Sequence, residues 1–331
     1  MNQTFLRRIL VVLAMVATVS LTLVSSTFGA DKIKLRMAGS GSATDIRAEA
    51  LGKEFGPAVA SFANYEGHWN ASLFKQGTEL EAIARGNLEM ALASAQELAV
   101  FIPEFSIFAA GYVHRDADHQ LAVFKNPLMD PLKQKVEETL NMKLLSVMYF
   151  GRRQVNLRTE KKVMVPGDLA GVNLRMPGTD AWQFLGKALG ASPTPVAFSE
   201  VYTALQTGAI DGQDNPLPTL VDKKFYEVTK QIILTSHLVD LNYIAISTKV
   251  WNKLSAKQQK TVQAAADKTA THARNKQLEL EKSLVAFLEK EGLKIYTPNV
   301  KAFREKAQKM YLESDYAEVW PKGLLDKINS L

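Results

Sequence analysis

A long segment near the carboxyl end of the chain contains neither proline nor glycine. It covers residues 256–290, where alanine, glutamine, glutamate, lysine and leucine dominate. Ser255 and Gln258 have the S-x-x-Q spacing of a helix capping box, and Gly292 follows the segment. One uninterrupted helix here would extend about 50 Å at about 1.5 Å per residue. Because that exceeds the width of a small lobe, we expect either a helix that bridges two lobes or two helices with a kink near 269–271.

Residues 1–30 have the pattern of a secretory signal peptide. Arg7 and Arg8 provide its positive charge, an apolar run covers 9–24, and small residues follow up to Ala30. An uncleaved membrane anchor is the alternative, but the apolar run is short for a bilayer-spanning helix of about 20 residues. Since no other long apolar run occurs, we expect an exported, soluble, periplasmic protein of about 300 residues.

The chain contains no cysteine, which excludes disulfides, thiolate metal sites and cysteine nucleophiles. Its formal charge is +6, and +4 remains without the two arginines of the signal peptide. This charge attracts anions weakly, and no basic cluster with interleaved aromatic residues accompanies it, so we expect no nucleic-acid partner. The sequence also lacks phosphate-loop, zinc-protease and serine-hydrolase motifs. We therefore expect no catalytic residue, no bound metal and no cofactor.

Short strand patterns alternate with helical patterns along residues 31–331, which is typical of an α/β fold. We expect strands at 33–37, 88–93, 143–150, 172–175, 194–197 and 243–247. We expect helices at 46–61, at 80–86 and at 199–207, the last with Ser199 as N-cap and Gly208 at its end. No flexible linker divides the chain, so we expect two lobes, each with its own core, joined by strands that cross between them.

Two segments carry side chains that suit a carboxylate ligand. In the first, a short strand runs to Arg175 and a proline turn follows at Pro177. Ligands bind at the carboxyl edges of α/β sheets, and the planar donors of a guanidinium fit both oxygens of a carboxylate. In the second, a tight turn at 211–212 precedes Asn215, whose amide both donates and accepts. A surface salt bridge for Arg175 and plain turn chemistry for Asn215 are the alternatives.

Six short motifs occur along the chain in a characteristic order. They include FGRRQ at 150–154, DLAGVNLRMP at 168–177, EVYTALQTG at 200–208 and DGQDNP at 211–216, with further matches at 73–90 and 189–193. Over residues 32 to about 328 the chain resembles the solute-binding subunit of tripartite ATP-independent periplasmic (TRAP) transporters, of the C4-dicarboxylate-binding, DctP-like type.

The resemblance implies a two-lobed periplasmic binding protein fold, with a cleft between the lobes and the long helix bridging them. Lobe I would comprise 31–150 plus about 239–278, and lobe II would comprise 151–238 plus about 279–331. The implied function is capture of a small organic acid and its delivery to a small and a large membrane subunit, through which alone the protein contacts the membrane. We expect a monomer.

The resemblance also implies ligand-binding roles for individual residues. Arg175 matches the arginine that clamps the ligand carboxylate, Asn215 matches the asparagine that hydrogen-bonds it, and Arg153 matches a second pocket arginine. Arg152 and Arg153 point to opposite faces of an extended strand, so only one of them enters the cleft. The weaker candidates for the pocket lining are Ser40, Ser42, Gln96, Tyr112 and Trp182.

Several alternatives remain open at this point. Trp182 also fits core or hinge packing. The loops at 75–77 and 109–112 depart from the family pattern, so the ligand need not be a C4-dicarboxylate. An exported enzyme acting on organic acids and a ligand-binding partner of a sensor kinase are the alternative functions.

Overall fold

Two long antiparallel strands form the middle of a mixed β-sheet in the computed structural model, which describes residues 32–331. They are β4, Met142–Leu157, and β8, Gln231–Ser247, and both are buried along most of their length. Their register shifts at three places, so neither strand is regular throughout. Residues 34–331 form a single compact unit. The predicted signal peptide, 1–30, lies outside the described residues.

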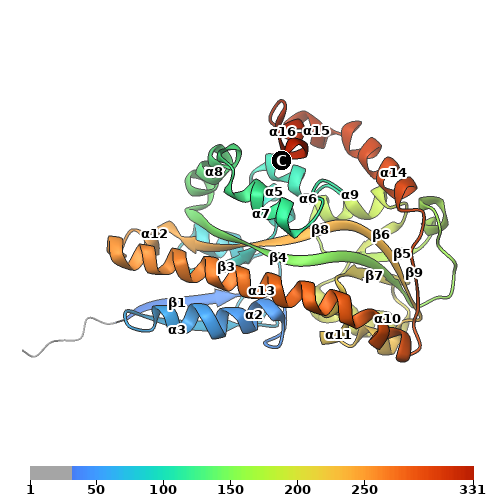
Figure 1. Ribbon diagram of the computed structural model, residues 1–331, viewed down its shortest axis with the longest axis horizontal. Coiled ribbons are helices and arrows are strands. Elements are labelled where there is room, and N and C mark those ends of the chain that lie inside the picture. The colour runs from blue at the N-terminus through green and yellow to red at the C-terminus, as the bar shows by residue number, and fades with distance from the viewer. Residues whose placement is uncertain (1–31) are drawn as a thin grey trace, which may run out of the picture. The chain divides into compact units, whose positions relative to one another are not determined.

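The other strands flank this central pair at its two ends (Figure 1). They are β1 Ile33–Ala38, β2 Ala63–His68, β3 Met90–Ala93, β5 Asn173–Met176, β6 Ser192–Pro195, β7 Gly212–Asn215 and β9 Lys294–Tyr296. In the described residues the sheet order is β2-β1-β3-β8-β4-β7-β5-β6, and β9 pairs with β8. We call β2, β1 and β3 the β1 end of the sheet, and β7, β5 and β6 the β5 end. Both ends share β4 and β8, which run from one end of the sheet to the other.

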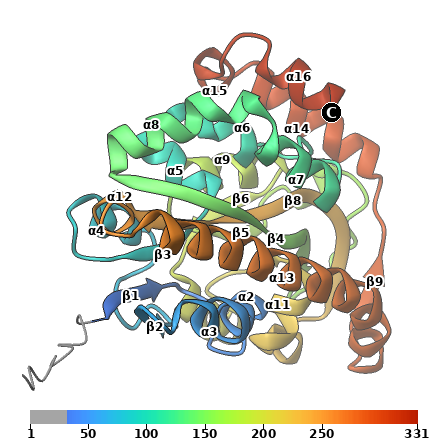
Figure 2. The same ribbon diagram turned by 60° about the vertical axis from the view of Figure 1, so that its left-hand side comes forward.

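Helices cover both faces of this sheet (Figures 1 and 2). One face carries α5 Ala95–Phe101, α6 Ser106–Ala109, α7 Ala117–Lys125, α8 Asp130–Leu140, α9 Asp180–Ala188, α14 Val300–Leu312, α15 Asp315–Val319 and α16 Leu324–Ser330. The other carries α2 Ile46–Ala50, α3 Gly56–Val59, α10 Val201–Thr207, α11 Leu217–Asp222 and the long α13. The remaining short helices are α4 Glu79–Ala84 and α12 Thr248–Trp251.

The long proline-free segment forms one continuous helix, α13, which covers Ala256–Lys290 and has 35 residues. Ser255 and Gln258 form the predicted capping box, with both reciprocal hydrogen bonds present. The helix packs along β4, contacts α2 and α3 at the β1 end, and contacts α11 and β9 at the other (Figure 2). The prediction of a bridging helix is confirmed, and the alternative with a kink at 269–271 is not. Neither α13 nor any other helix of the described residues is long and apolar enough to cross a membrane.

Several predicted elements differ from the observed ones in length or in their ends. The strands predicted at 143–150 and 243–247 are only parts of β4 and β8. Ser199 does not cap a helix, because it lies in a 3₁₀ turn at Phe198–Glu200 and α10 begins at Val201 without a side-chain cap. Gly208 does end α10, with a left-handed φ of 80° that suits glycine.

A substitution at Gly151 tests how closely α13 packs against β4. It lies at a register shift of β4 with a φ of 124°, and an added Cβ would meet the Gln277 amide, with Glu281 Oε1 and Pro216 Cβ each at 2.7 Å. Gly151→Ala should therefore lower the free energy of unfolding by about 2–4 kcal/mol, measured by urea titration. Gly52→Ala is the matched control, because no atom of residues 32–331 that counts as a neighbour lies within 4 Å of the added carbon. Equal losses in the two variants would contradict this account.

Candidate functional site

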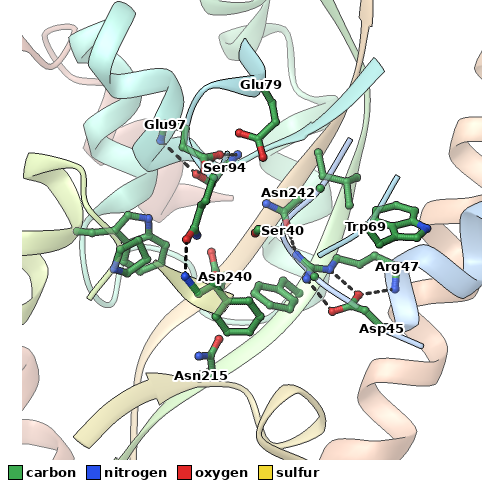
Figure 3. Close-up of a pocket in the computed structure, with 18 of the residues that line it drawn as sticks. Ser40, Asp45, Arg47, Trp69, Glu79, Ser94, Glu97, Asn215, Asp240 and Asn242 are labelled. Atoms are coloured by element: carbon green, nitrogen blue, oxygen red, sulfur yellow. Dashed lines mark hydrogen bonds and ion pairs between the residues drawn. The ribbon is translucent and has the colours of Figure 1, made fainter. Parts of the chain in front are cut away.

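A cavity lies beside the middle of the sheet, and residues from both ends of the sheet line it. The loop after β1, the residues before α4 and the start of α5 form one wall, whereas β4, β5, β7 and the turn at Phe198 form the other. Polar side chains from both walls converge on this space (Figure 3). Five predicted pocket residues line it, namely Arg153, Arg175, Asn215, Ser40 and Trp182.

The other three predicted lining residues lie outside the cavity lining. Ser42 donates to Asp222 Oδ2 at 2.6 Å. The Tyr112 hydroxyl donates to the Thr235 carbonyl at 3.0 Å, and Tyr112 lines a separate cavity. Gln96 is buried in α5 and does not line the cavity, although its neighbours Ser94 and Glu97 do. Neither polar atom of its side chain has a hydrogen-bond partner within residues 32–331.

Three adjacent strands position Arg153, Asn215 and Arg175. β7 lies between β4 and β5, so Asn215 pairs with Gln154 of β4 while Gln213 pairs with Arg175 of β5. Pro177 directly follows β5 and cannot donate to a further ladder bond. Arg175 therefore stands near the carboxyl end of a short parallel strand, which is where α/β sheets bind ligands.

Arg175 is a buried guanidinium that has no carboxylate partner within residues 32–331. Its exposed fraction is 1%, its Nε donates to the Val196 carbonyl at 2.8 Å, and its Nη2 has no hydrogen-bond partner among the same residues. Burial lowers the pKa of Arg175 to about 9, while the distant charge of Asp214 favours ionisation and that of Arg153 opposes it. An anion in the cavity would relieve the desolvation of this cation and engage its terminal nitrogens.

Asn215 is oriented by a chain of buried amides. Its Nδ2 donates to Gln213 Oε1 at 2.6 Å, and Gln213 Nε2 donates to Asn156 Oδ1 at 3.1 Å. Asn156 Nδ2 donates in turn to the Gln231 carbonyl at 3.0 Å. An amide nitrogen carries two hydrogens, so Asn215 retains one N–H for a ligand in the same cavity as Arg175.

Arg153 forms an internal ion network. Its Nε donates to Asp214 Oδ2 at 2.6 Å, its Nη1 to Asp240 Oδ2 at 2.8 Å, and its Nη2 to the Asp214 carbonyl and Oδ1. His237 Nε2 lies 3.0 Å from the same Asp214 oxygen. Burial opposes ionisation, yet the two carboxylates raise the pKa of Arg153 above its ordinary value. Four of the five N–H groups are engaged, so Arg153 offers a ligand one donor at most.

Arg152 and Trp182 complete the surroundings of Arg153. Arg152 does not line the cavity and donates to the Arg115 carbonyl at 2.8 Å near the surface. This arrangement agrees with the alternation of side chains along an extended strand. The Arg153 guanidinium carbon lies 4.6 Å from the centre of the Trp182 ring, so Trp182 both packs on the network and lines the cavity.

Arg47, which the sequence analysis did not predict, reaches the cavity from α2. Its Nε and Nη2 donate to Asp45 Oδ1 and Oδ2 at 2.8 and 2.7 Å, and its Nη1 donates to Asn242 Oδ1. The guanidinium carbon lies 3.6 Å from the centre of the Phe150 ring. Although burial opposes ionisation, Arg47 holds the pKa of Asp45 below its ordinary value. Arg47 is therefore a lining cation whose charge is already neutralised.

Glu79 and Glu97, also not predicted, line the wall opposite Asn215 (Figure 3). Glu79 Oε2 accepts from the Gly77 N–H at 2.7 Å, and Glu97 Oε2 accepts from the N–H and hydroxyl of Ser94 at 3.1 and 2.9 Å. Burial raises the pKa of both acids, and the neighbouring Glu97 adds to the effect at Glu79. The S-x-x-E spacing of Ser94 and Glu97 is the sequence signal that places Glu97 at a helix start.

Direct hydrogen bonds also connect the segment 40–78 to the segment 196–223. Ser42 and Thr44 donate to the two carboxylate oxygens of Asp222, each at 2.6 Å. The Phe198 N–H donates to Gln76 Oε1 at 2.9 Å. Ser40 and Gln76 from the first segment and Phe198 from the second line the cavity, so these bonds hold its two walls together.

The chain is similar to known bacterial solute-binding proteins. Residues 61–317 match the family described as bacterial extracellular solute-binding protein, family 7. The sialic acid-binding periplasmic protein SiaP of Vibrio cholerae is 33% identical over 246 residues, which cover 74% of this chain and 76% of that protein.

Solved structures give the same result. A TRAP periplasmic solute-binding protein from Roseobacter denitrificans, with bound 3-deoxy-D-manno-oct-2-ulosonic acid (KDO), is 64% identical with a TM-score of 0.90, over 91% of this chain and 99% of that one. Another from the same species, with bound L-galactonate, is 26% identical with a TM-score of 0.81, over 90% and 98% of the two chains. The predicted two-lobed α/β binding-protein fold is thereby confirmed. The chain belongs to bacterial extracellular solute-binding protein family 7, the periplasmic solute-binding proteins of TRAP transporters, which bind small organic acids and are not enzymes.

Proposed function

We propose that this chain captures a sugar acid with one carboxylate, of the 2-ulosonic class that includes KDO, and delivers it to the TRAP membrane subunits. One observation carries the proposal. Three arginines of the part of the chain that the structure describes line the cavity, and there Arg47 and Arg153 are paired with carboxylates whereas Arg175 is not. A buried cation without a counter-ion favours one anionic group on the ligand.

The relatives support a sugar acid over a C4-dicarboxylate. The protein that is 64% identical to this chain has KDO bound, and the Vibrio cholerae relative is a sialic acid-binding protein. Both ligands are 2-keto sugar acids with a single carboxylate and several hydroxyl groups. The C4-dicarboxylate type suggested by the sequence motifs is therefore the weaker expectation for this chain.

We assign the carboxylate to Arg175 and Asn215. The Nη1 and Nη2 groups of Arg175 form the planar fork, because Nε already donates to Val196. The remaining N–H of Asn215 adds a further donor to the same carboxylate. Arg153 contributes its one remaining N–H, and Ser40 contributes a hydroxyl from the opposite wall. The charge of the ligand is thus neutralised at one end of the cavity.

Closure of two lobes gives this site its function. We assign lobe I to 31–150 plus about 239–278, and lobe II to 151–238 plus about 279–331, so that the boundaries cross β4, β8 and α13. Hinge closure brings the 40–78 and 196–223 segments together, forming the bonds of Asp222 and Phe198. Closure excludes water and strengthens the ion pair at Arg175, so a ligand selects the closed form that the transporter recognises.

The family is periplasmic, and this chain carries a matching amino-terminal pattern. We propose that residues 1–30 direct export and are then removed. The protein acts as a monomer and meets the membrane only through the small and large TRAP subunits.

Replacing Arg175 tests the carboxylate clamp. Arg175→Ala leaves a buried carboxylate unpaired at a cost of about 3–5 kcal/mol, so the Kd for KDO should rise about 10²–10⁴-fold in titration calorimetry. Arg175→Lys should also bind weakly, because the fork is lost. The matched control is Arg152→Ala, since Arg152 lies outside the cavity lining. A wild-type Kd for Arg175→Ala would contradict the proposal.

A thermal-shift screen tests the ligand class. Free ligand at about 100 times its Kd adds about 2.7 kcal/mol to stability, which should raise the Tm by several degrees. KDO should give such a shift, N-acetylneuraminate and L-galactonate smaller ones, and neutral D-mannose none. A screen in which only uncharged sugars, or only succinate, stabilise the protein would overturn the assignment to sugar acids.

A further inference from the structure

We propose that Glu79 and Glu97 form a polyol subsite, which binds the hydroxyl groups at the end of the ligand remote from its carboxylate and rejects ligands with a second carboxylate there. The inference rests on the proposed function, because it takes the ligand carboxylate to lie at Arg175. It adds a basis for selecting among carboxylates, which an arginine clamp alone does not provide.

The two acids lie on the wall that faces the clamp. Glu79 is the first residue of α4 and Glu97 lies in the first turn of α5, whereas Arg175 and Asn215 come from β5 and β7. All four side chains line one cavity, with Glu79 and Glu97 across it from Asn215 (Figure 3). A sugar acid held by its carboxylate at Arg175 therefore extends toward the acids.

Among the described residues, donors at 2.7–3.1 Å reach only one oxygen of each carboxyl group. The Gly77 N–H donates to Glu79 Oε2, and both donors of Ser94 reach Glu97 Oε2. Within the described residues neither acid forms an ion pair, so Oε1 of Glu79 and Oε1 of Glu97 are left as acceptors. Carboxyl oxygens accept strong hydrogen bonds from hydroxyl groups, which a polyhydroxy chain supplies.

The charged groups around the pair disfavour a second carboxylate. Burial is the main cause that raises the pKa of Glu97, Asp240 of β8 acts in the same direction, and Arg47 of α2 opposes it. Arg47 and Asp240 are themselves paired, with Asp45 and Arg153 respectively. A carboxylate at this end of the ligand would meet two acids and no unpaired cation, and like charges at close range repel.

Isosteric variants and a matched pair of ligands test the subsite. The variants are Glu79→Gln, Glu97→Gln and the double variant. Glu97→Gln keeps the helix start, because Ser255 and Gln258 form the same capping box with glutamine. Near about pH 8, above the pKa of Glu79, each single variant should raise the Kd for KDO about 5–10-fold, since a charge-assisted bond becomes a neutral one.

D-Gluconate and D-glucarate differ only at carbon 6, which is a primary alcohol in D-gluconate and a carboxylate in D-glucarate. The wild type should prefer D-gluconate, and the double variant should reduce that preference at least about tenfold. Glu81→Gln is the matched control, because Glu81 lies on the same helix but is exposed and paired with Arg85. Thermal melting of each variant confirms that it is folded.

The outcomes separate the two proposals. If KDO binds the wild type and Arg175→Ala removes binding, but the glutamine variants keep both the wild-type Kd and the wild-type preference, the polyol subsite is wrong and the proposed function stands. If the wild type binds neither KDO nor D-gluconate, both the proposed function and the polyol subsite are wrong.

The pH dependence of stability gives a readout without ligand. Burial and the neighbouring Glu97 raise the pKa of Glu79 from 4.5 to about 7. Between these values the folded protein retains a proton that the unfolded chain has released, so stability falls as the pH rises from about 4.5 to about 7. Glu79→Gln removes this loss, so its Tm should exceed that of the wild type by several degrees near about pH 8 and by much less near about pH 5. If the Tm of Glu79→Gln differed from that of the wild type by the same amount at both pH values, the proposed pair of buried acids would be wrong.

Discussion

The buried ion network of Arg153 supports the part of the sheet from which the cavity is built. It joins β4 to β7 through Asp214 and to β8 through Asp240, and His237 adds a further bond to Asp214. Removing any one charge would leave the others uncompensated in a buried place, which is strongly destabilising. Because Arg153 is already paired with Asp214 and Asp240, the network fixes three strands without an anion from outside. The adjacent strand β5 can then present Arg175 unpaired.

The lining arginines thus share a chemical group but differ in their partners. Arg47 is held by Asp45 and lies on the Phe150 ring, Arg153 is held by two aspartates, and Arg175 is held only by a backbone carbonyl. Burial alone would make each of them costly. Because only Arg175 lacks a carboxylate partner within the described residues, the end of the cavity at Arg175 favours an anionic group. In the proposed subsite, Glu79 and Glu97 make the other end favour hydroxyl groups over a carboxylate.

The features that depend on local sequence were the predictable ones. The absence of proline and glycine in 256–290 specifies α13. The proline turn after β5 drew attention to Arg175, and the tight turn at 211–212 drew attention to Asn215. The length of β8 was not predictable from periodicity, because His237, Asp240 and other buried polar residues interrupt its apolar pattern. Arg47, Glu79 and Glu97 reach the cavity only through contacts between segments far apart in the chain. For the same reason the sequence could not show that Ser42 and Tyr112 bond to other partners. It also could not show that Gln96 is buried outside the cavity lining.

The shared strands β4 and β8 also limit how such a protein can be divided or recombined. Any fragment that ends between 157 and 231 retains β4 but lacks its principal pairing partner, so the two walls of the cavity cannot be produced as separate folding pieces. A chimera with a relative of different specificity should therefore keep both strands from one parent. Short segments that line the cavity and follow other strands, such as residues 75–79 after β2 and 94–97 after β3, are better units of exchange.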